Sequence, residues 1–380
     1  MAKLLTAIGL MSGTSMDGID VALVETDGDG IFHFGPTMAM AYPPAFKGRL
    51  ERGLLDAQAI KERTDRPGDL VALEQALTDF HAQVVNRFLT ENGLAVHSID
   101  LLGFHGQTVL HRPNEGVTIQ LGDGQALADA TGITTVYDMR AADMEAGGQG
   151  APLIPVFHRA LAGSLKNTGP TCFVNIGGIS NITYVDGETL IAFDTGPGNA
   201  LIDQWVAQKA GIPFDSGGTI ASEGRVLASV VNRYLAAPFF DESGPKSLDR
   251  NDFPPLESGS AELADGARSL ARLTAEAIAK SLDQLPTAPA RWIISGGGRL
   301  NVTIMGDLAE ILDGAEVQTA EAAGFDGDMM EAQAFAYLAV RARRSLSLTF
   351  PTTTGCRGAV TGGKTVAPQT TPSPLPGLAR

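Results

Sequence analysis

The chain has 380 residues, 44% of them hydrophobic, and its 28 basic and 43 acidic side chains give a net charge of −15. This length exceeds what one ordinary hydrophobic core needs and predicts two domains. The acidic balance argues against nucleic acid or an anionic membrane surface as a partner, because both are bound through clustered positive charge.

Apolar runs and turn residues predict the elements of the first half of the chain. A strand is expected over residues 4–10, followed by a Gly-rich turn and a second strand over 19–24. Apolar residues at helical spacing predict a helix over 70–88. Two more strands are expected over 99–104 and 133–137.

Glycine and proline become dense at residues 147–152, and a domain boundary is expected close to them. Beyond this point the opening layout recurs, with strands over 171–176 and 181–185 joined by a Gly-rich turn. One unit of strand, turn and strand in each half suggests a single α/β fold used twice.

The later elements of the second half follow by the same criteria. A strand over 189–193 leads through a loop to a helix that starts at Ala200, and Asn199 is placed to cap that helix. The remaining expected elements are a helix over 263–285, a strand over 291–294 with a helix after it, and a last helix over about 328–344.

The turn between the first two strands has the composition of an anion-binding loop. Its glycines allow a tight turn, its hydroxyls add donors, and successive N–H groups form a nest for phosphate. Its two aspartates suit a phosphate only if a divalent cation such as Mg²⁺ lies between, and we favour Asp20 over Asp17 as the metal ligand. An ordinary hairpin turn is the alternative. The predicted phosphate contacts are Gly13, Thr14, Ser15, Met16, Asp17, Gly18, Ile19 and Asp20.

Two further loops follow strands in the second half. Gly296, Gly297 and Gly298 come after an apolar strand, and bare backbone there predicts a platform for adenine or ribose. Asp194 follows another strand, in a loop rich in Gly and Pro, where a carboxylate suits a general base. A plain turn and a helix cap are the respective alternatives.

Polar side chains also follow the strand over 99–104. His105, Gln107, His111 and Arg112 are expected on a loop, as sugar contacts or as a structural turn. No metal site is expected there, since no carboxylate or cysteine stands at ligand spacing. Glu331 opens the last helix, where a favourable charge at a helix N-terminus is the alternative to a binding role.

Residues 358–365 match the P-loop pattern, yet we predict that they form only a C-terminal turn or short hairpin. A working P-loop precedes a helix, whereas here Pro368 and a Pro-rich end follow. The two cysteines, Cys172 and Cys356, show no disulfide framework, which favours a reducing compartment. With no apolar run long enough to span a membrane, a cytoplasmic location is expected.

Six motifs, in order along nearly the whole chain, resemble the anhydro-N-acetylmuramic acid kinase family of the sugar kinase/heat-shock protein/actin superfamily. They are residues 9–20, 104–108, 147–153, 175–181 and 193–199, and Glu331-Ala332 with Phe335-Ala336. The resemblance implies two actin-like (ribonuclease H-like) domains flanking an ATP cleft. We expect domain I to comprise residues 1–140 plus 347–380, and domain II residues 141–346.

The resemblance also implies a reaction: ATP-dependent conversion of 1,6-anhydro-N-acetylmuramic acid to N-acetylmuramic acid 6-phosphate, in peptidoglycan recycling. The family's catalytic Asp falls on Asp194, which would activate a water, while the first loop, Mg²⁺ and the glycines hold ATP. The same resemblance implies that Gly177 and Gly178 form the second phosphate loop. The implied sugar contacts are His105, Gln107, Arg140, Gln149, Asn199 and Glu331. A homodimer is plausible by the same resemblance.

Two alternatives stay open at this point. One is a kinase of the same superfamily that acts on another sugar or a carboxylic acid. The other is an actin-like nucleotide switch with a protein partner. Met139, Met144 and Glu145 depart from the family pattern and leave the contacts around Arg140 open.

Overall fold

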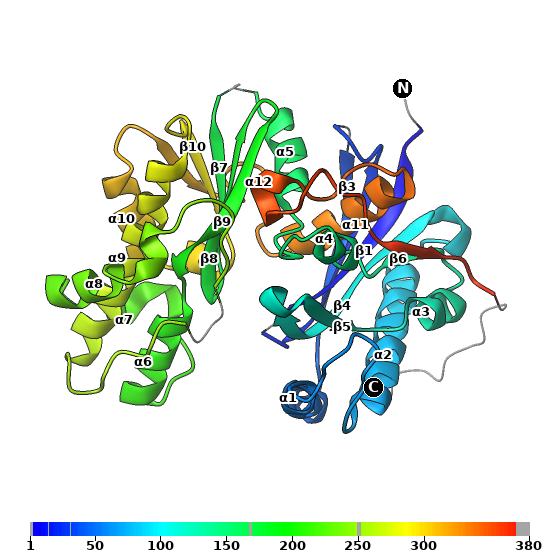
Figure 1. The fold of residues 1–380 in the computed structure, drawn as a ribbon, viewed down its shortest axis with the longest axis horizontal. Coiled ribbons are helices and arrows are strands. Elements are labelled where there is room, and N and C mark those ends of the chain that lie inside the picture. The colour runs from blue at the N-terminus through cyan, green and yellow to red at the C-terminus, as the bar shows by residue number, and fades with distance from the viewer. Residues whose placement is uncertain (1–2, 14, 31, 167–168, 249–251, 370–380) are drawn as a thin grey trace. The chain divides into compact units, whose positions relative to one another are not determined.

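The protein is described by a computed structural model over residues 3–13, 15–30, 32–166, 169–248 and 252–369. It folds into two compact units (Figure 1). Unit 1 comprises Met1–Ala160 with Met329–Arg380, and unit 2 comprises Leu161–Asp328. The boundaries expected from the sequence differ: residues 141–160 and 329–346, placed in domain II, fold with unit 1.

Unit 1 is built on a sheet in the order β12-β6-β4-β1-β2-β3, with β5 paired to β4. Strands β1, β2 and β3 are antiparallel neighbours, whereas β4 runs parallel to β1 and β6 parallel to β4. The strands are β1 (Leu5–Ser12), β2 (Gly18–Thr26), β3 (Phe32–Ala41), β4 (Leu101–Arg112), β5 (Val117–Leu121), β6 (Thr135–Tyr137) and β12 (Lys364–Val366).

Helices cover both faces of this sheet. Along β1, Ile8 and Leu10 join the core that includes Leu73 and Phe88 of α2, while Gly9 faces α11 on the opposite side. This alternation follows from the period of two in a strand. The helices of unit 1 are α1 (Pro44–Ala57), α2 (Leu70–Glu91), α3 (Gly124–Thr131), α4 (Ala141–Glu145), α5 (Pro155–Ser164, which crosses the unit boundary), α11 (Met330–Arg343) and α12 (Pro351–Thr354).

Unit 2 is built on a sheet in the order β11-β10-β7-β8-β9. Figure 1 shows helices α6 to α10 together on one side of it. The strands are β7 (Thr171–Ile176), β8 (Ile179–Asp186), β9 (Thr189–Pro197), β10 (Arg291–Ser295) and β11 (Glu316–Thr319). The helices are α6 (Ala200–Ala210), α7 (Thr219–Ser222), α8 (Ala228–Leu235), α9 (Leu263–Lys280) and α10 (Val302–Ile311).

The two sheets repeat one topology. Each begins with three antiparallel strands, and the fourth strand then pairs parallel with the first. The order β3-β2-β1-β4-β6 in unit 1 corresponds to β9-β8-β7-β10-β11 in unit 2. The prediction of an α/β protein with one fold used twice is therefore confirmed, and this is the arrangement that the resemblance to the actin superfamily implies.

Two predicted loops are wrong. Strand β4 continues to Arg112, so His105, Gln107, His111 and Arg112 lie within a strand. Strand β9 continues to Pro197, so Asp194 also lies in a strand. In both cases a glycine that signalled a turn is accommodated inside the strand: Gly106 with φ of 72° and Gly196 with φ of 150°.

Residues 358–365 do not form a P-loop, as predicted. Lys364–Val366 is strand β12, which pairs antiparallel with β6. The Lys364 ammonium lies 2.9 Å from Asp138 Oδ2. No helix follows within the described residues, which reach 369.

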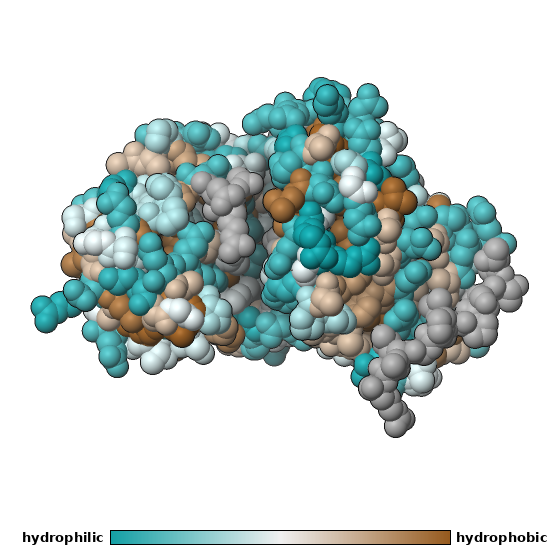
Figure 2. All heavy atoms as spheres, turned by 90° about the horizontal axis from the view of Figure 1, so that it is seen from below, coloured by the Kyte–Doolittle hydropathy of each residue, from teal (hydrophilic) through white to brown (hydrophobic). Residues whose placement is uncertain are grey.

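The surface is largely hydrophilic on the face that Figure 2 shows, with smaller hydrophobic areas on each unit. Across the described part of the chain, no helix is both long enough and apolar enough to cross a bilayer.

Candidate active site

A buried polar cluster holds the end of β1, where the first loop begins. The Ser12 hydroxyl donates to Gln107 Oε1 at 2.5 Å, and Gln107 Nε2 donates to the Gly13 carbonyl at 3.1 Å. Since that hydroxyl proton is used, the Tyr42 hydroxyl donates to Ser12 Oγ, at 2.8 Å. Burial raises the pKa of Tyr42, which keeps this donor protonated. The end of β1 is thus fixed where the loop begins.

The loop itself turns tightly. The Met16 N–H donates to the Gly13 carbonyl at 3.1 Å, and Met16 adopts φ of 54°. A Cβ on Gly18 would lie 2.3 Å from the Met40 carbonyl, so packing against β3 accounts for this glycine, whereas a Cβ on Gly13 would meet only Ser15 Oγ, at 3.7 Å. Ser15 is exposed. Thr14 lies outside the described residues.

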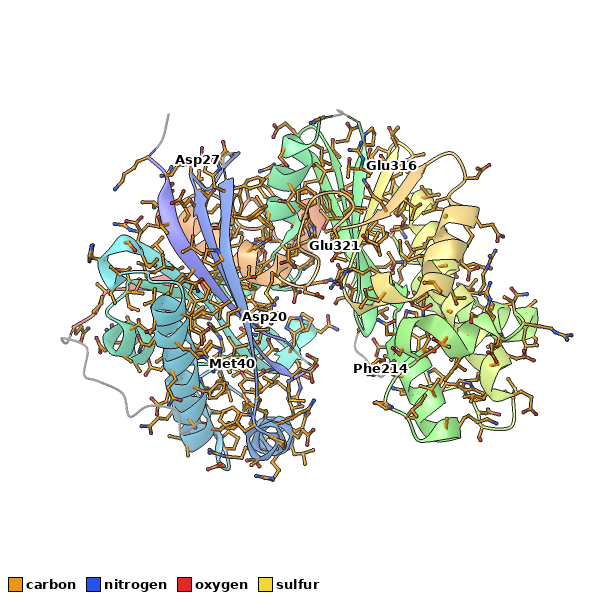
Figure 3. The ribbon with its side chains drawn as sticks, turned by 180° about the vertical axis from the view of Figure 1, so that it is seen from behind. Asp20, Asp27, Met40, Phe214, Glu316 and Glu321 are labelled. Carbon is orange, nitrogen blue, oxygen red and sulfur yellow. The ribbon has the colours of Figure 1, made fainter. Side chains whose placement is uncertain are left out.

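The two aspartates of the loop differ in environment. The Asp17 carboxylate is 72% exposed and forms an ion pair of 2.7 Å with Lys47. Asp20 lies on β2, and Figure 3 shows it toward the end of the strand opposite Asp27. Asp20 is close enough to Glu331 that its charge helps to raise the pKa of that carboxyl. Asp20 is therefore the aspartate that belongs to an inner acidic pair.

Helix α11 places Glu331 beside Asp20. Gly9 and Gly103 lie opposite each other in the parallel pair β1–β4. A Cβ on Gly9 would be 1.8 Å from the Ala332 carbonyl, and one on Gly103 2.1 Å from the Phe335 carbonyl. The first turns of α11 thus lie directly on the sheet, which no side chain at either position would allow.

Arg140 joins this cluster from the end of β6. Its guanidinium donates through Nη1 to the Gly150 carbonyl at 2.8 Å and through Nη2 to His105 Nε2 at 3.0 Å. Burial lowers the pKa of Arg140 to about 10, and the carboxylates of Glu331 and Asp143 oppose that shift. Burial raises the pKa of Glu331, against the pull of Arg140. Arg140 Nε has no hydrogen-bond partner among the residues that the structure describes.

His105 is a neutral acceptor in this arrangement. Burial, followed by the Arg140 charge, lowers the pKa of His105 to about 3. Since Nε2 accepts from Arg140, the proton sits on Nδ1, which is close to the carbonyls of Ser12 and Gly106 without hydrogen-bond geometry to either. The imidazole therefore aims Arg140 rather than carrying charge.

Asp143, which the sequence did not single out, shapes the loop over residues 147–150. Its buried carboxylate accepts from the Gly150 N–H and the Thr354 hydroxyl, both at 2.6 Å. A Cβ on Gly148 would lie 2.3 Å from this carboxylate. Gln149 is half-buried, and its N–H donates to the Thr354 carbonyl at 2.8 Å. In the sequence, only the glycines of the motif over residues 147–153 pointed to this region, and nothing marked Asp143 itself.

In unit 2, Asp194 lies at a β-bulge. Asn181 of β8 pairs with Asp194 while Ser180 pairs with Gly196, so Thr195 is the extra residue. The Leu248 N–H donates to Asp194 Oδ2 at 2.8 Å. Burial raises the pKa of Asp194 to about 7, and the Leu248 hydrogen bond opposes this. A half-buried carboxyl with this pKa exists in both forms near neutrality.

Asn199 does not cap helix α6, contrary to the prediction. Its side-chain amide donates to the Ile176 carbonyl at 3.1 Å. The backbone N–H groups of Gly198 and Ala200 donate to the Gly178 carbonyl, and that of Asn199 donates to the Gly177 carbonyl. Asn199 thus lies with the second glycine turn, whereas the sequence placed it among the sugar contacts.

The three glycines after β10 have separate reasons. Gly296 has φ of 72°, and a Cβ there would lie 2.3 Å from Asn175 Oδ1; a Cβ on Gly298 would lie 2.2 Å from the Ile176 side chain. Gly297 has only the Asn199 amide nearby, at 3.6 Å. Packing explains the outer two glycines, and only Gly297 keeps an open face for a ligand.

The predicted site residues therefore form two groups. Unit 1 brings together the first loop, Gln107, His105, Arg140 and Glu331, and unit 2 holds Asp194 and, around Asn199, the second and third glycine turns. Within the described residues, no three His, Cys, Asp or Glu side chains gather as a metal-binding group.

Comparison with known proteins identifies the family. The anhydro-N-acetylmuramic acid kinase family matches residues 5–368. An anhydro-N-acetylmuramic acid kinase of Rhizobium etli is 55% identical over 365 residues, covering 96% of this chain and 99% of that protein. The protein of the same name from Agrobacterium fabrum is 54% identical over 368 residues, with the same coverage.

A solved structure of a ROK family glucokinase from Streptomyces griseus, in complex with glucose and AMPPNP, is 14% identical and covers 88% of this chain and 99% of that chain at a TM-score of 0.42. A likeness this distant carries no functional argument. The family matches define the class as an ATP-dependent sugar kinase. Within that class, the chain belongs to the anhydro-N-acetylmuramic acid kinase family.

Proposed function

We propose that this protein uses ATP and water to convert 1,6-anhydro-N-acetylmuramic acid to N-acetylmuramic acid 6-phosphate. The names of the relatives support this substrate. The observation that carries the proposed mechanism is the Asp194 carboxyl, fixed by the Leu248 N–H, with its pKa raised to about 7 by burial. A base with this pKa is matched to proton transfer near neutral pH.

Asp194 accepts a proton from a water molecule as that water attacks the anomeric carbon. A C1–O bond to water forms, the C1–O6 bond of the anhydro bridge breaks, and O6 attacks the γ-phosphorus. ADP leaves with the electron pair of the broken P–O bond. A single carboxylate thus serves ring opening, and the phosphoryl acceptor is generated in place.

The nucleotide is held by backbone donors in this proposal. The first loop binds the β- and γ-phosphates, and Gly177, Gly178 and the open face at Gly297 serve the remainder of ATP. Mg²⁺, when bound, neutralises phosphate charge. The acidic pair of Asp20 and Glu331 fits such a cation, since their mutual repulsion helps raise the pKa of Glu331.

In this proposal the cluster around Arg140 binds the sugar. Its guanidinium is oriented by His105 and Gly150, and its Nε–H has no hydrogen-bond partner within the described part of the chain. The remaining predicted contacts are Gln149, Asn199, Gln107 and Glu331. The cellular setting proposed is peptidoglycan recycling in the cytoplasm, by a protein that forms a homodimer.

ADP release tests this function. Purified protein receives Mg-ATP with 1,6-anhydro-N-acetylmuramic acid, N-acetylmuramic acid, or glucose, and ADP is followed by a coupled assay. Only the anhydro sugar should stimulate ADP release. Stimulation by another sugar instead would favour the broader alternative of a related sugar kinase, and no stimulation by any sugar would refute a kinase role on these substrates.

A further inference from the structure

Lys246 is a buried cation whose backbone contacts the strand of the proposed base, and its ammonium has defined partners. The residue is 8% exposed. Its Nζ donates to the Phe239 carbonyl at 2.8 Å and to the Glu242 carbonyl at 3.0 Å. It also lies 4.2 Å from the centroid of the Phe239 ring. The ammonium therefore ties Lys246 to the short helix η4 (Pro238–Asp241) and the residue after it.

The backbone around Lys246 holds Asp194 at two points. The Asp194 N–H donates to the Lys246 carbonyl at 2.9 Å, and the Leu248 N–H donates to the Asp194 carboxylate at 2.8 Å. The segment over residues 246–248 thus runs beside β9 at the bulge. Because Leu248 supplies the hydrogen bond to the carboxylate, the position of this segment sets the environment of the carboxyl.

The lysine side chain lies on the other side of the strand from that carboxylate. Phe193 and Thr195, the two neighbours of Asp194, line a small pocket together with Lys246, Lys280 and Ser281, whereas Asp194 does not. The Lys246 ammonium also lies 5.9 Å from the centroid of the Phe193 ring. The Lys246 ammonium therefore lies on the side of β9 opposite the Asp194 carboxylate and does not contact it.

We propose that Lys246 is a positioning residue for the reaction: its ammonium anchors the segment 246–248, whose backbone in turn fixes the Asp194 carboxylate. This inference rests on the proposed role of Asp194. In this proposal Lys246 positions the general base. It does not bind the phosphates or the sugar, which are common roles for a lysine in a kinase.

The charged groups that face Lys246 are Glu242, Asp241 and Lys280. Burial lowers the pKa of Lys246, Glu242 opposes that shift, Lys280 adds to it, and Asp241 opposes it. For Asp194, burial raises the pKa and the Leu248 N–H lowers it. A change at Lys246 should therefore reach Asp194 through the hydrogen bond from Leu248.

Lys246→Met keeps the alkyl chain and removes the ammonium. Releasing the segment weakens the Leu248 hydrogen bond, which favours the ionised carboxylate, so the pKa of Asp194 should rise by about one pH unit. kcat at pH 7 should fall about fivefold or more and recover toward the wild-type value at pH 9, with KM for ATP unchanged. Lys280→Met, which removes a neighbouring cation that anchors nothing in this segment, should leave the profile in place.

A second readout does not depend on activity. Protein with ¹³C-labelled aspartate carboxyls, in which the Asp194 signal is assigned by its loss in Asp194→Asn, is titrated by NMR. The Asp194 titration should move upward in Lys246→Met and in Leu248→Pro, which deletes the N–H donor itself. Titrations identical to wild type in folded variants would overturn the proposal for Lys246. Absence of sugar-stimulated ADP release by wild type would instead refute the proposed function, whatever the titration shows.

Discussion

Gln107 accepts a hydrogen bond of 2.5 Å from the Ser12 hydroxyl, and so a residue of β4 holds the end of β1 at the first loop. The same side chain donates to the Gly13 carbonyl. Both ends of the amide are thus used inside the protein. The sugar contact that the sequence suggested for Gln107 stays a prediction, and the geometry favours a role in shaping the phosphate loop.

Gln107→Ala should therefore impair the nucleotide side first. Without the amide, Ser12 and the Gly13 carbonyl lose their partners, and KM for ATP should rise about tenfold with a smaller change in KM for the sugar. Gln120→Ala, on neighbouring β5 with hydrogen bonds to Thr108 and Thr118, is the matched control. A rise in KM for the sugar alone would contradict this role and would indicate that Gln107 contacts the sugar.

The pH dependence of turnover should report Asp194. Its pKa is raised to about 7, and a general base acts in its ionised form, so kcat should fall as pH drops below 7. Asp194→Asn should lower kcat by about 10²–10⁴-fold and keep ATP binding, measured by calorimetry. A wild-type profile that is flat from pH 5 to 9, or near-normal turnover in the variant, would remove Asp194 from the base role.

The same carboxyl should lower stability at high pH. Burial raises the pKa of Asp194 from the ordinary 3.8 of an aspartic acid, so its contribution to stability is fully present below pH 3.8 and is lost as pH rises from there through about 7. Asp194→Asn should then raise the free energy of unfolding by on the order of 2 kcal/mol at pH 8 and by little at pH 4. Thermal unfolding at both pH values checks this, with exposed Asp186→Asn as control; equal effects at both pH values would contradict it.

Helix α11 should not tolerate a side chain under it. Gly9→Ala places a Cβ 1.8 Å from the Ala332 carbonyl and should cost about 3 kcal/mol or more of stability. Gly48→Ala, in helix α1 with only Arg52 within 4 Å, should instead stabilise by about 0.5–1 kcal/mol. Denaturant unfolding compares the two, and a Gly9→Ala protein as stable as wild type would show that α11 is not held this closely.

Lys364→Ala should leave ATP binding intact. Lys364 is 64% exposed and pairs with Asp138 from strand β12. Its loss should change Kd for ATP less than about twofold and stability by less than about 1 kcal/mol. A tenfold weaker Kd would revive residues 358–365 as a nucleotide loop.

Burial on one face imposes a period on the sequence, and local pattern therefore predicted strands β1, β2, β4, β6 and β7 to β10 and helices α2, α9 and α11. Strands β5 and β11 and helix α1 were not predicted. Strand β3 was not predicted because Gly35-Pro36 interrupts its sequence pattern. Proline is excluded from most strands but tolerated here, since β3 is at the sheet edge and its register with β2 shifts between Ala22 and Val24.

The chemistry of the site was predictable by residue type more than by contact. Asp194 was singled out from its motif, yet its partners Lys246 and Leu248 lie some fifty residues further along the chain. Asn199 and Gln107 were expected to contact ligand, and the structure shows their amides bonded to backbone carbonyls. Such long-range hydrogen bonds leave no periodic trace in a sequence.

The mass of the sugar product tests whether ring opening by water and phosphoryl transfer to O6 are coupled. Protein, Mg-ATP and 1,6-anhydro-N-acetylmuramic acid are incubated in ¹⁸O-enriched water and the product is measured at once by mass spectrometry. If water opens the anhydro bridge and O6 takes the phosphoryl group, the product gains one phosphoryl group and one water, with the heavy oxygen on the anomeric carbon and none in the phosphate. A product that gains a phosphoryl group without water, or heavy oxygen in the phosphate, would contradict it.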